Sequence, residues 1–292
     1  MNRIKGILYA AVSSSTFGLA PFFSITLLLA GFSAFEVLSY RWGVASIVLI
    51  VFGWLSGCNF RLAGKDWGVV FLLSLLRAVT SFSLIIAYQN IASGVASTIH
   101  FMYPLAVALA MMFFFREKKS LLVILAVLMS LLGAALLSLG ELEAKSGNTM
   151  VGLVAACVSV FSYAGYIVGV RTTRAVQINS TALTCYVMGL GTIFYLIGAY
   201  CTSGLQLVSD GYTWLIILVL ALPATAISNI TLVQAIKYAG PTLTSILGAM
   251  EPLTAVVIGV FVFKELFTVN SAVGIILILL AVSIVVFRRQ KS

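Results

Sequence analysis

Residues 97–117, STIHFMYPLAVALAMMFFFRE, and residues 245–265, SILGAMEPLTAVVIGVFVFKE, follow one pattern in two places of the chain. In each stretch a proline interrupts an apolar run, and a glutamate stands thirteen residues after that proline. Farther out, residues 6–13, GILYAAVS, resemble residues 152–159, GLVAACVS, at a shift of 146. Such self-similarity at a long period indicates that one structural unit is present twice. A shift of 148 residues makes these positions coincide: Ser97 with Ser245, Pro104 with Pro252, Arg116 with Lys264, and Glu117 with Glu265.

The composition excludes a soluble globular fold. Of the 292 residues, 62% are hydrophobic and 9% are charged, whereas soluble domains are about half apolar and about a quarter charged. A single core in a water-soluble protein cannot bury so much apolar surface, so we expect lipid to surround much of the chain. In a soluble protein the net charge of +9 would suggest nucleic acid, but most of the basic residues here lie in short connections, and we expect no nucleic-acid partner. The four cysteines are scattered without CxxC spacing, so we expect no metal, cofactor or disulfide framework.

The apolar runs predict an all-α polytopic membrane protein with ten transmembrane helices. A helix needs about 20 apolar residues to cross the hydrocarbon core. The strands of a β-barrel would instead give short alternating segments, and these runs are continuous. The expected spans are residues 4–29, 34–55, 67–88, 94–115, 120–139, 150–170, 180–203, 212–236, 241–263 and 269–287.

Charges in the connections alternate between the two sides of the membrane. By the positive-inside rule the basic side is cytoplasmic, which predicts a multi-pass protein of the cell (inner) membrane with both termini in the cytoplasm. Five spans per unit is an odd number, so the second unit must enter the membrane upside down. We therefore expect two inverted five-helix repeats, residues 1–141 and 149–292, with a polar joint between them. The basic side carries Arg3, Lys5, Arg61, Lys65, Arg116, Lys118, Lys119, Arg171, Arg174, Lys237, Arg288, Arg289 and Lys291. Four tryptophans fall near expected span ends, where indole rings favour the interface: Trp42, Trp54, Trp67 and Trp214.

This plan resembles the EamA-type carriers of the drug/metabolite transporter superfamily. The resemblance covers essentially the whole chain and rests on the ten-span, two-repeat plan together with the repeated proline-to-glutamate pattern. Arg41, early in the second expected span, is also typical of that family. The chain departs from the pattern at Arg116 and Lys264, where the family more often has glycine. The resemblance implies a carrier that exports or takes up amino acids, metabolites, drugs or similar small solutes.

Two ionisable residues at membrane depth are the strongest site candidates, because a charge there is expensive unless it is paired or wetted. Arg77 lies near the middle of the third expected span, where it would hold a substrate carboxylate or act as a structural clamp. Glu251 is the only acid at its depth in the ninth expected span. It would pair with Arg77, bind a substrate amine, take up a proton, or serve packing. Tyr103 occupies the matching place in the first repeat, so we expect the site to be asymmetric in charge.

Two equivalent spans carry matched polar stripes. Ser81 is four residues past Arg77, and the shift of 148 residues turns this pair into Thr225 and Asn229, which are again four residues apart. The matched placement predicts a substrate cavity at the interface of the repeats, near the membrane midplane. The alternative is that these side chains only join helices through hydrogen bonds.

Other polar and aromatic residues are weaker candidates. His100, the only histidine, precedes Tyr103 by three residues, and it would contact the solute or be a hydrogen-bonded core residue. Tyr163 and Tyr166 read first as packing residues. Four prolines fall inside expected spans, where each frees a backbone carbonyl and allows bending: Pro21, Pro104, Pro223 and Pro252.

These features predict a secondary transporter that moves small metabolites, amino acids or related solutes, by alternating access, with efflux as the expected direction. Its partners would be the solute and the lipid bilayer; proton coupling and oligomeric state stay open. An intramembrane enzyme is the first alternative, but the chain has one histidine and no GxSxG, HExxH or P-loop motif. A pore-like facilitator is the second, but rings of like charge are absent from the sequence.

Overall fold

The computed structural model describes residues 2–117, 120–138, 147–202, 204–254, 257 and 268–288. The secondary structure in this part of the chain is helical, and no strand occurs in it. The helices of the first half are α1 (Asn2–Phe17), α2 (Ala20–Leu29), α3 (Ala34–Leu55), η1 (Gly64–Asp66), α4 (Trp67–Asn90), α5 (Ser93–His100), α6 (Tyr103–Phe113) and α7 (Leu121–Ser138). Those of the second half are α8 (Thr149–Thr172), η3 (Arg174–Gln177), α9 (Ser180–Cys201), α10 (Gly211–Ala221), η4 (Leu222–Ile227), α11 (Ser228–Ala239), α12 (Pro241–Leu247) and α14 (Val269–Arg288).

Several of these helices are long and apolar enough to cross a membrane, so the chain is a multi-pass membrane protein. The seven segments that meet this criterion within the described residues coincide with expected spans: Arg3–Leu29, Ala34–Leu55, Gly64–Asn90, Val95–Phe113, Thr149–Thr172, Ser180–Cys201 and Gly211–Ala239. Shorter apolar stretches occupy the fifth and tenth expected places: Leu121–Gly133 and Ala272–Ile284. The ninth expected span is described only in part, and several residues named above lie outside the described ranges: Lys118, Lys119, Lys264, Glu265, Arg289 and Lys291.

Prolines determine where the spans break in the first half. A proline has no N–H to donate, and its ring collides with the carbonyl four residues earlier. Accordingly, α1 ends at Phe17, four residues before Pro21, and α5 ends at His100, four residues before Pro104. Each span then resumes as a second helix, so the first and fourth spans are discontinuous.

The second half breaks at corresponding places. α12 ends at Leu247, five residues before Pro252. Pro223 lies in the π-helix η4, where the Thr225 hydroxyl donates to the Leu220 carbonyl oxygen at 2.7 Å, five residues back. Discontinuous spans and π-turns recur at the binding sites of membrane carriers. The prolines of this chain thus bring irregular backbone to the middle of the bundle.

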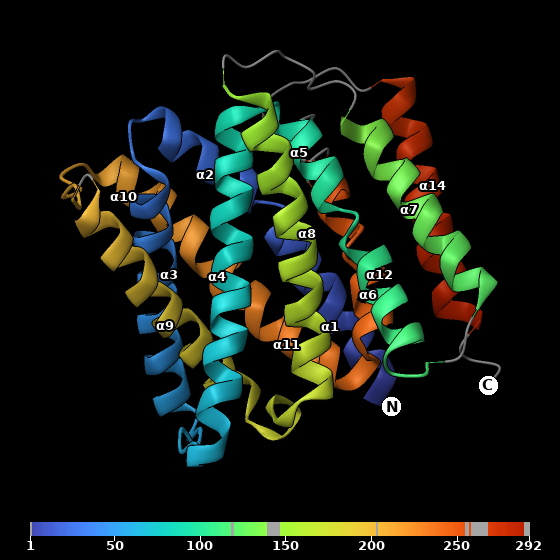
Figure 1. Cartoon of the computed structure of the whole chain (residues 1–292), viewed down its shortest axis with the longest axis horizontal. Coiled ribbons are helices and arrows are strands. Elements are labelled where there is room, and N and C mark those ends of the chain that lie inside the picture. The colour runs from blue at the N-terminus through green and yellow to red at the C-terminus, as the bar shows by residue number, and fades with distance from the viewer. Residues whose placement is uncertain are drawn as a thin grey trace.

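Each main contact in the bundle joins one half to the other. α4 lies along α8, so the third span of the first repeat meets the first span of the second repeat. α1 lies along α11, so the first span of the first repeat meets the third span of the second repeat. α3 packs on α9 and α7 on α14, each helix against its own counterpart. Figure 1 shows that the members of each pair run in opposite directions. At Gly133 of α7 a Cβ would come within 2.8 Å of the Gly274 carbonyl oxygen of α14, so this crossing needs a glycine.

One end of the bundle gathers basic connections. Arg171 donates from Nη1 to the Lys237 carbonyl oxygen at 2.8 Å, and the Lys237 ammonium donates to the Ile178 carbonyl oxygen. Arg174 forms an ion pair with Asp66 at 3.0 Å. The first turn of α1 and the last turns of α14 lie at this same end (Figure 1). At the opposite end, Asp210 begins α10 and accepts the Thr213 N–H at 2.7 Å, which lowers the pKa of the Asp210 carboxyl.

The expectation that Trp42 marks a membrane interface is wrong. Its side chain is 1% exposed and lies on the face of α3 that packs on α9. The indole meets Tyr195 edge-on at 5.1 Å between ring centroids, and a Cβ at Gly191 would come within 2.1 Å of it. Trp54 is 78% exposed near the end of α3, as an interfacial indole should be. Position along the span alone therefore could not distinguish the buried Trp42 from the interfacial Trp54.

Candidate functional site

Arg77 is the centre of a buried polar cluster. Its side chain is 1% exposed, in the middle of α4. Nε donates to Oδ1 of Asn229 at 3.0 Å, and Nη1 donates to the Ser81 hydroxyl at 3.1 Å. Asn229 is held in turn, because its Nδ2 donates to the Thr225 carbonyl oxygen at 2.7 Å. The two polar stripes predicted from the repeat therefore lie against each other, one from each half of the chain.

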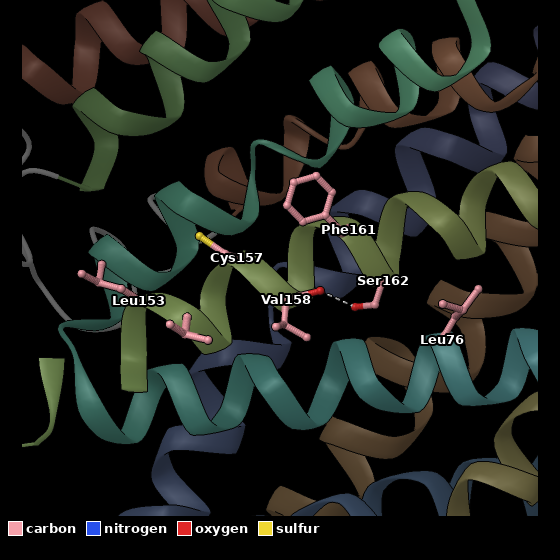
Figure 2. Close-up of a pocket in the computed structure, with 7 residues that line it drawn as sticks. Leu76, Leu153, Cys157, Val158, Phe161 and Ser162 are labelled. Carbon is pink, nitrogen blue, oxygen red and sulfur yellow. Dashed lines mark hydrogen bonds between the residues drawn. The ribbon is translucent and has the colours of Figure 1, made fainter. Parts of the chain in front are cut away.

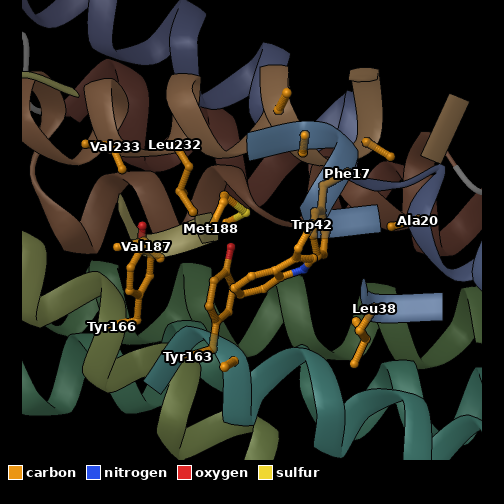
Figure 3. Close-up of a cluster of buried hydrophobic side chains, with 14 of the residues drawn as sticks. Phe17, Ala20, Leu38, Trp42, Tyr163, Tyr166, Val187, Met188, Leu232 and Val233 are labelled. Atoms are coloured by element: carbon orange, nitrogen blue, oxygen red, sulfur yellow. The ribbon is translucent and has the colours of Figure 1, made fainter. Parts of the chain in front are cut away.

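Aromatic rings enclose the Arg77 guanidinium. A cation within about 6 Å of a ring centroid is attracted to the face of the ring. The distances from the Arg77 Cζ atom to the ring centroids are 5.0 Å for Tyr163, 5.4 Å for Phe17, 5.9 Å for Tyr166 and 6.0 Å for Trp42. Figure 3 shows the rings of Phe17, Trp42, Tyr163 and Tyr166 converging from α1, α3 and α8. Three helices of the bundle thus contribute to one cation-binding cage.

Arg41 of α3 belongs to the same cluster. It is 5% exposed, donates from Nε to the Thr225 hydroxyl at 2.6 Å, and donates from Nη2 to the Ala224 carbonyl oxygen at 3.4 Å. Its Cζ atom lies 5.5 Å from the Phe17 ring centroid, so this ring contacts both arginines. The π-turn explains the bond to Ala224, because irregular backbone at η4 leaves a carbonyl oxygen for a neighbouring helix to bind.

Glu251 lies close to this cluster without an ion pair. It is 6% exposed, and Arg77 is the cation whose charge acts on its carboxylate. In the described part of the chain only Arg174 and Asp66 come within 4.0 Å as an ion pair, so Glu251 and Arg77 remain apart. A Cβ at Gly18 would lie 2.7 Å from the Glu251 carbonyl oxygen, so the break after α1 packs directly on the break after α12.

The rings of His100 and Tyr103 extend the aromatic cluster beyond Tyr163. His100 Nδ1 lies 2.9 Å from the Ser159 hydroxyl, and its ring stacks on Tyr163 with centroids 5.4 Å apart. Tyr103 meets Tyr163 edge-on at 4.6 Å. The position of the Tyr103 hydroxyl is tight, because a Cβ on Gly248 would come within 1.7 Å of it. Tyr103 and Gly248 thus join the broken fourth span to the broken ninth.

A small cavity opens beside the arginines. Its volume is about 20 Å³, enough for one water molecule. Arg41, Arg77 and Ser81 line it together with Phe17 and Ser24. Four polar atoms close to these residues are buried without a hydrogen-bond partner in the described structure: Ser24 Oγ, Trp42 Nε1, Tyr166 Oη and His100 Nε2. Buried polar atoms are rarely left unpaired, and their gathering here marks a place built to receive polar groups.

A larger hollow of about 610 Å³ lies elsewhere, on the outer surface between α4 and α8. Figure 2 shows its lining residues, Leu76, Leu153, Cys157, Val158, Phe161 and Ser162, in the crevice between these helices. Phe161 is 72% exposed, and Val158 is 41% exposed. An apolar surface of this kind suits lipid chains, so the hollow is not part of the polar site.

The repeated proline-to-glutamate pattern has a structural explanation in the first half. Thr242, the second residue of α12, donates from its hydroxyl to Oε2 of Glu117 at 2.6 Å. A carboxylate at a helix N-terminus is favoured by the helix dipole. The end of the fourth span therefore anchors the beginning of the ninth. The matching glutamate, Glu265, lies outside the described residues.

The structure brings all seven sequence-derived candidates into one region: Arg77, Ser81, His100, Tyr103, Thr225, Asn229 and Glu251. Sequence reasoning did not place Arg41 in the site, although its position inside the second expected span was a usable signal. It also ranked Tyr163 and Tyr166 as packing residues, whereas both rings lie against Arg77. Within the described residues no group of three His, Cys, Asp or Glu side chains could hold a metal ion.

Comparison with known proteins supplies the family. The sequence model of the EamA-like transporter family matches the chain twice, over residues 4–139 and over residues 150–287. No curated protein is similar enough in sequence to count as a match. Among solved structures, 29 chains match; one of them, titled "Crystal structure of protein", has a TM-score of 0.81 and 18% sequence identity, covering 100% of this chain and 99% of that chain. At that identity the likeness shows a shared fold.

Proposed function

Because this chain belongs to the EamA-like transporter family, we propose that it is a secondary transporter of small metabolites, amino acids or related solutes. The solute would cross the cell membrane by alternating access, with efflux as the net direction, and without a chemical step. The single observation that carries this proposal is the cluster around Arg77, where charged and aromatic groups from both halves meet among broken helices. Ionisable groups held at such a place inside a membrane bundle mark substrate pathways.

The topology we propose has ten transmembrane helices in two inverted five-helix repeats, residues 1–141 and 149–292. The cross-repeat pairing of helices in opposite directions supports it (Figure 1). The basic end of the bundle, with Arg171, Arg174 and Lys237, would face the cytoplasm together with both termini. The repeats would rock about the central cluster, so that the two halves exchange conformations and the site opens to one side and then the other.

The broken fourth and ninth spans are the moving parts in this mechanism. They contact each other through Tyr103 and Gly248 at the middle and through Glu117 and Thr242 near one end. The central cavity, at about 20 Å³, is too small for a metabolite, so this conformation is closed around the site. Separation of these two spans would enlarge the cavity next to Arg77.

A counterflow screen in proteoliposomes tests the proposal. Purified protein is reconstituted with a high internal concentration of one unlabelled compound, and entry of its labelled form is followed for amino acids, small acids and amines. We expect at least one class to accumulate transiently above equilibrium, and we expect Arg77→Gln to lose that signal. Arg174→Gln, which removes an arginine from the bundle end, is the matched control and should keep it. Absence of counterflow for all three classes with correctly inserted protein would contradict the proposal.

A further inference from the structure

Two arginines share one buried cavity at the centre of the bundle. Arg41 and Arg77 both line it, and the ring of Phe17 lies within 5.5 Å of each guanidinium carbon. The positive charges of Arg41 and Arg77 repel each other, and this repulsion is strong in a site of low dielectric constant. A pair of cations held together in this way is stable only if something negative or strongly polar offsets the repulsion.

The protein offsets this charge only in part. Glu251 is the nearby acid that acts on Arg77, and neither arginine has a carboxylate within 4.0 Å in the described structure. The hydrogen bonds of the arginines go instead to neutral groups: Asn229, Ser81, Thr225 and the Ala224 carbonyl. Two cations and one acid leave the cluster with an excess of positive charge.

Each guanidinium also keeps one terminal nitrogen available. Arg41 uses Nε and Nη2, and Arg77 uses Nε and Nη1. Among the described residues, Arg41 Nη1 and Arg77 Nη2 have no hydrogen-bond partner. Ser24, which lines the same cavity, has a buried hydroxyl without a partner there. Both arginines and the unpartnered Ser24 hydroxyl therefore line one small cavity.

We propose that Arg41 and Arg77 together bind one carboxylate of the transported solute, and that the solute is a small organic acid with net negative charge. This inference rests on the proposed transport function and narrows its substrate class from amino acids in general to acids. Planar guanidinium groups match the two oxygens of a carboxylate. Charge-assisted hydrogen bonds of this kind are stronger than hydrogen bonds between neutral groups. Ser24 would donate a third bond, and Phe17 would hold the two guanidinium groups in place.

The acid is preferred over a zwitterion because of the charge count. A neutral amino acid brings one carboxylate and one ammonium, which leaves the excess positive charge of the cluster in place. A solute whose carboxylates outnumber its ammonium groups offsets that excess. Burial of an uncompensated charge is unfavourable, so the occluded complex with an acid is the more stable one.

A binding assay on detergent-solubilised protein tests the proposal without requiring transport. Thermal unfolding and titration calorimetry are carried out with glutarate, with glutaramide, which replaces its carboxylates by neutral amides, and with chloride. We expect glutarate to raise the Tm in a concentration-dependent way and glutaramide to have no effect. Equal stabilisation by glutaramide would overturn the proposal, and equal stabilisation by chloride would assign the cavity to a small inorganic anion instead.

Variants tie the effect to the two arginines. Arg41→Gln should weaken glutarate binding by at least about tenfold, and Arg41→Lys, which keeps the charge but loses the planar fork, should bind with intermediate affinity. Ser24→Ala is a milder change that keeps both arginines, and we expect a several-fold loss because it removes the third donor to the acid. Arg174→Gln is the control and should bind as the wild type does. Unchanged glutarate binding in Arg41→Gln, or in Ser24→Ala should Arg41→Gln not fold, would contradict the proposal.

Different results overturn the anion site and the transport function. Protein that binds glutarate but exchanges no solute in proteoliposomes would overturn the transport function and leave the anion site. Protein that exchanges neutral amino acids but does not bind glutarate would overturn the anion site and leave the transport function.

Discussion

Arg77 of α4 donates its Nε–H to Asn229 of α11 at 3.0 Å, and Asn229 is the residue that the 148-residue repeat matches with Ser81, the second partner of Arg77. One arginine therefore binds a side chain on its own helix and the repeat-equivalent side chain on the counterpart helix. Arg41 completes the arrangement by binding Thr225, which the repeat matches with Arg77 itself. Equivalent positions of the two repeats thus lie together, and because their residues differ, the cluster is asymmetric in charge.

Replacement of Arg77 by glutamine should abolish solute counterflow while the protein still inserts into the membrane. Glutamine retains a donor for Asn229 or Ser81 but lacks the charge, and loss of one buried charged partner lowers affinity by about 2–5 kcal/mol. The measurement is initial counterflow rate at matched amounts of reconstituted protein. Wild-type rates in this variant would leave Arg77 only a structural role.

Replacement of Glu251 by glutamine should flatten the pH dependence of transport. Glu251 is the buried acid next to the Arg77 cluster, and glutamine has nearly the same shape but takes up no proton. If the carboxyl exchanges a proton during the cycle, the wild-type rate varies with pH and the variant rate does not. Counterflow rates are compared across acid, neutral and alkaline pH with equal pH on both sides. Identical pH profiles would exclude Glu251 as the proton carrier.

Replacement of Gly248 by alanine should lower the thermal stability of the closed state. The added Cβ would come within 1.7 Å of the Tyr103 hydroxyl oxygen, and overpacking of this kind costs about 1–3 kcal/mol. The double variant Gly248→Ala/Tyr103→Leu should recover part of that loss, because the shortened side chain leaves room for the methyl group. Additive losses of Tm in the two single variants and the double variant would show that the two positions are not in contact.

Replacement of Thr242 by valine should weaken the link between the fourth and ninth spans. The change removes the hydroxyl that donates to Glu117 at 2.6 Å, and loss of a hydrogen bond to a charged acceptor costs about 1.5–3 kcal/mol. Glu117→Gln, which keeps an acceptor oxygen but loses the charge, should cost less, and the double variant should cost little more than Thr242→Val alone. Thermal unfolding of the three proteins checks this coupling. Simple addition of the two losses would refute the proposed anchor.

The sequence predicted the membrane fold well because lipid imposes strong rules. Continuous apolar runs gave the spans that the structure describes, and Pro21 and Pro104 marked where two of them break. The 148-residue register predicted that Arg77, Ser81, Thr225 and Asn229 lie together, since equivalent helices of a duplicated bundle meet at its interface. These inferences needed only hydropathy, proline chemistry and repetition.

Other features depend on contacts that a linear pattern does not contain. Arg41 and Trp42 are neighbours in α3, but their surroundings differ. Arg41 binds Thr225 of η4, whereas Trp42 packs against α9, and the sequence of α3 alone shows neither contact. The aromatic side chains of Tyr163 and Tyr166 had the spacing of ordinary packing residues, and only the path of α8 along α4 brings them to Arg77. The separation of Glu251 from Arg77 likewise follows from packing of the broken helices, not from depth in the membrane.

Two-sided labelling of a cysteine in the central cluster tests alternating access most directly. Ser81→Cys is made in a chain whose four native cysteines, Cys58, Cys157, Cys185 and Cys201, are replaced by alanine. Sealed vesicles of both orientations are treated with a membrane-impermeant thiol reagent, with and without the solute that gives counterflow. We expect labelling from both sides, slowed by the solute in each case. Labelling from one side only, or from neither side in transport-competent protein, would contradict it.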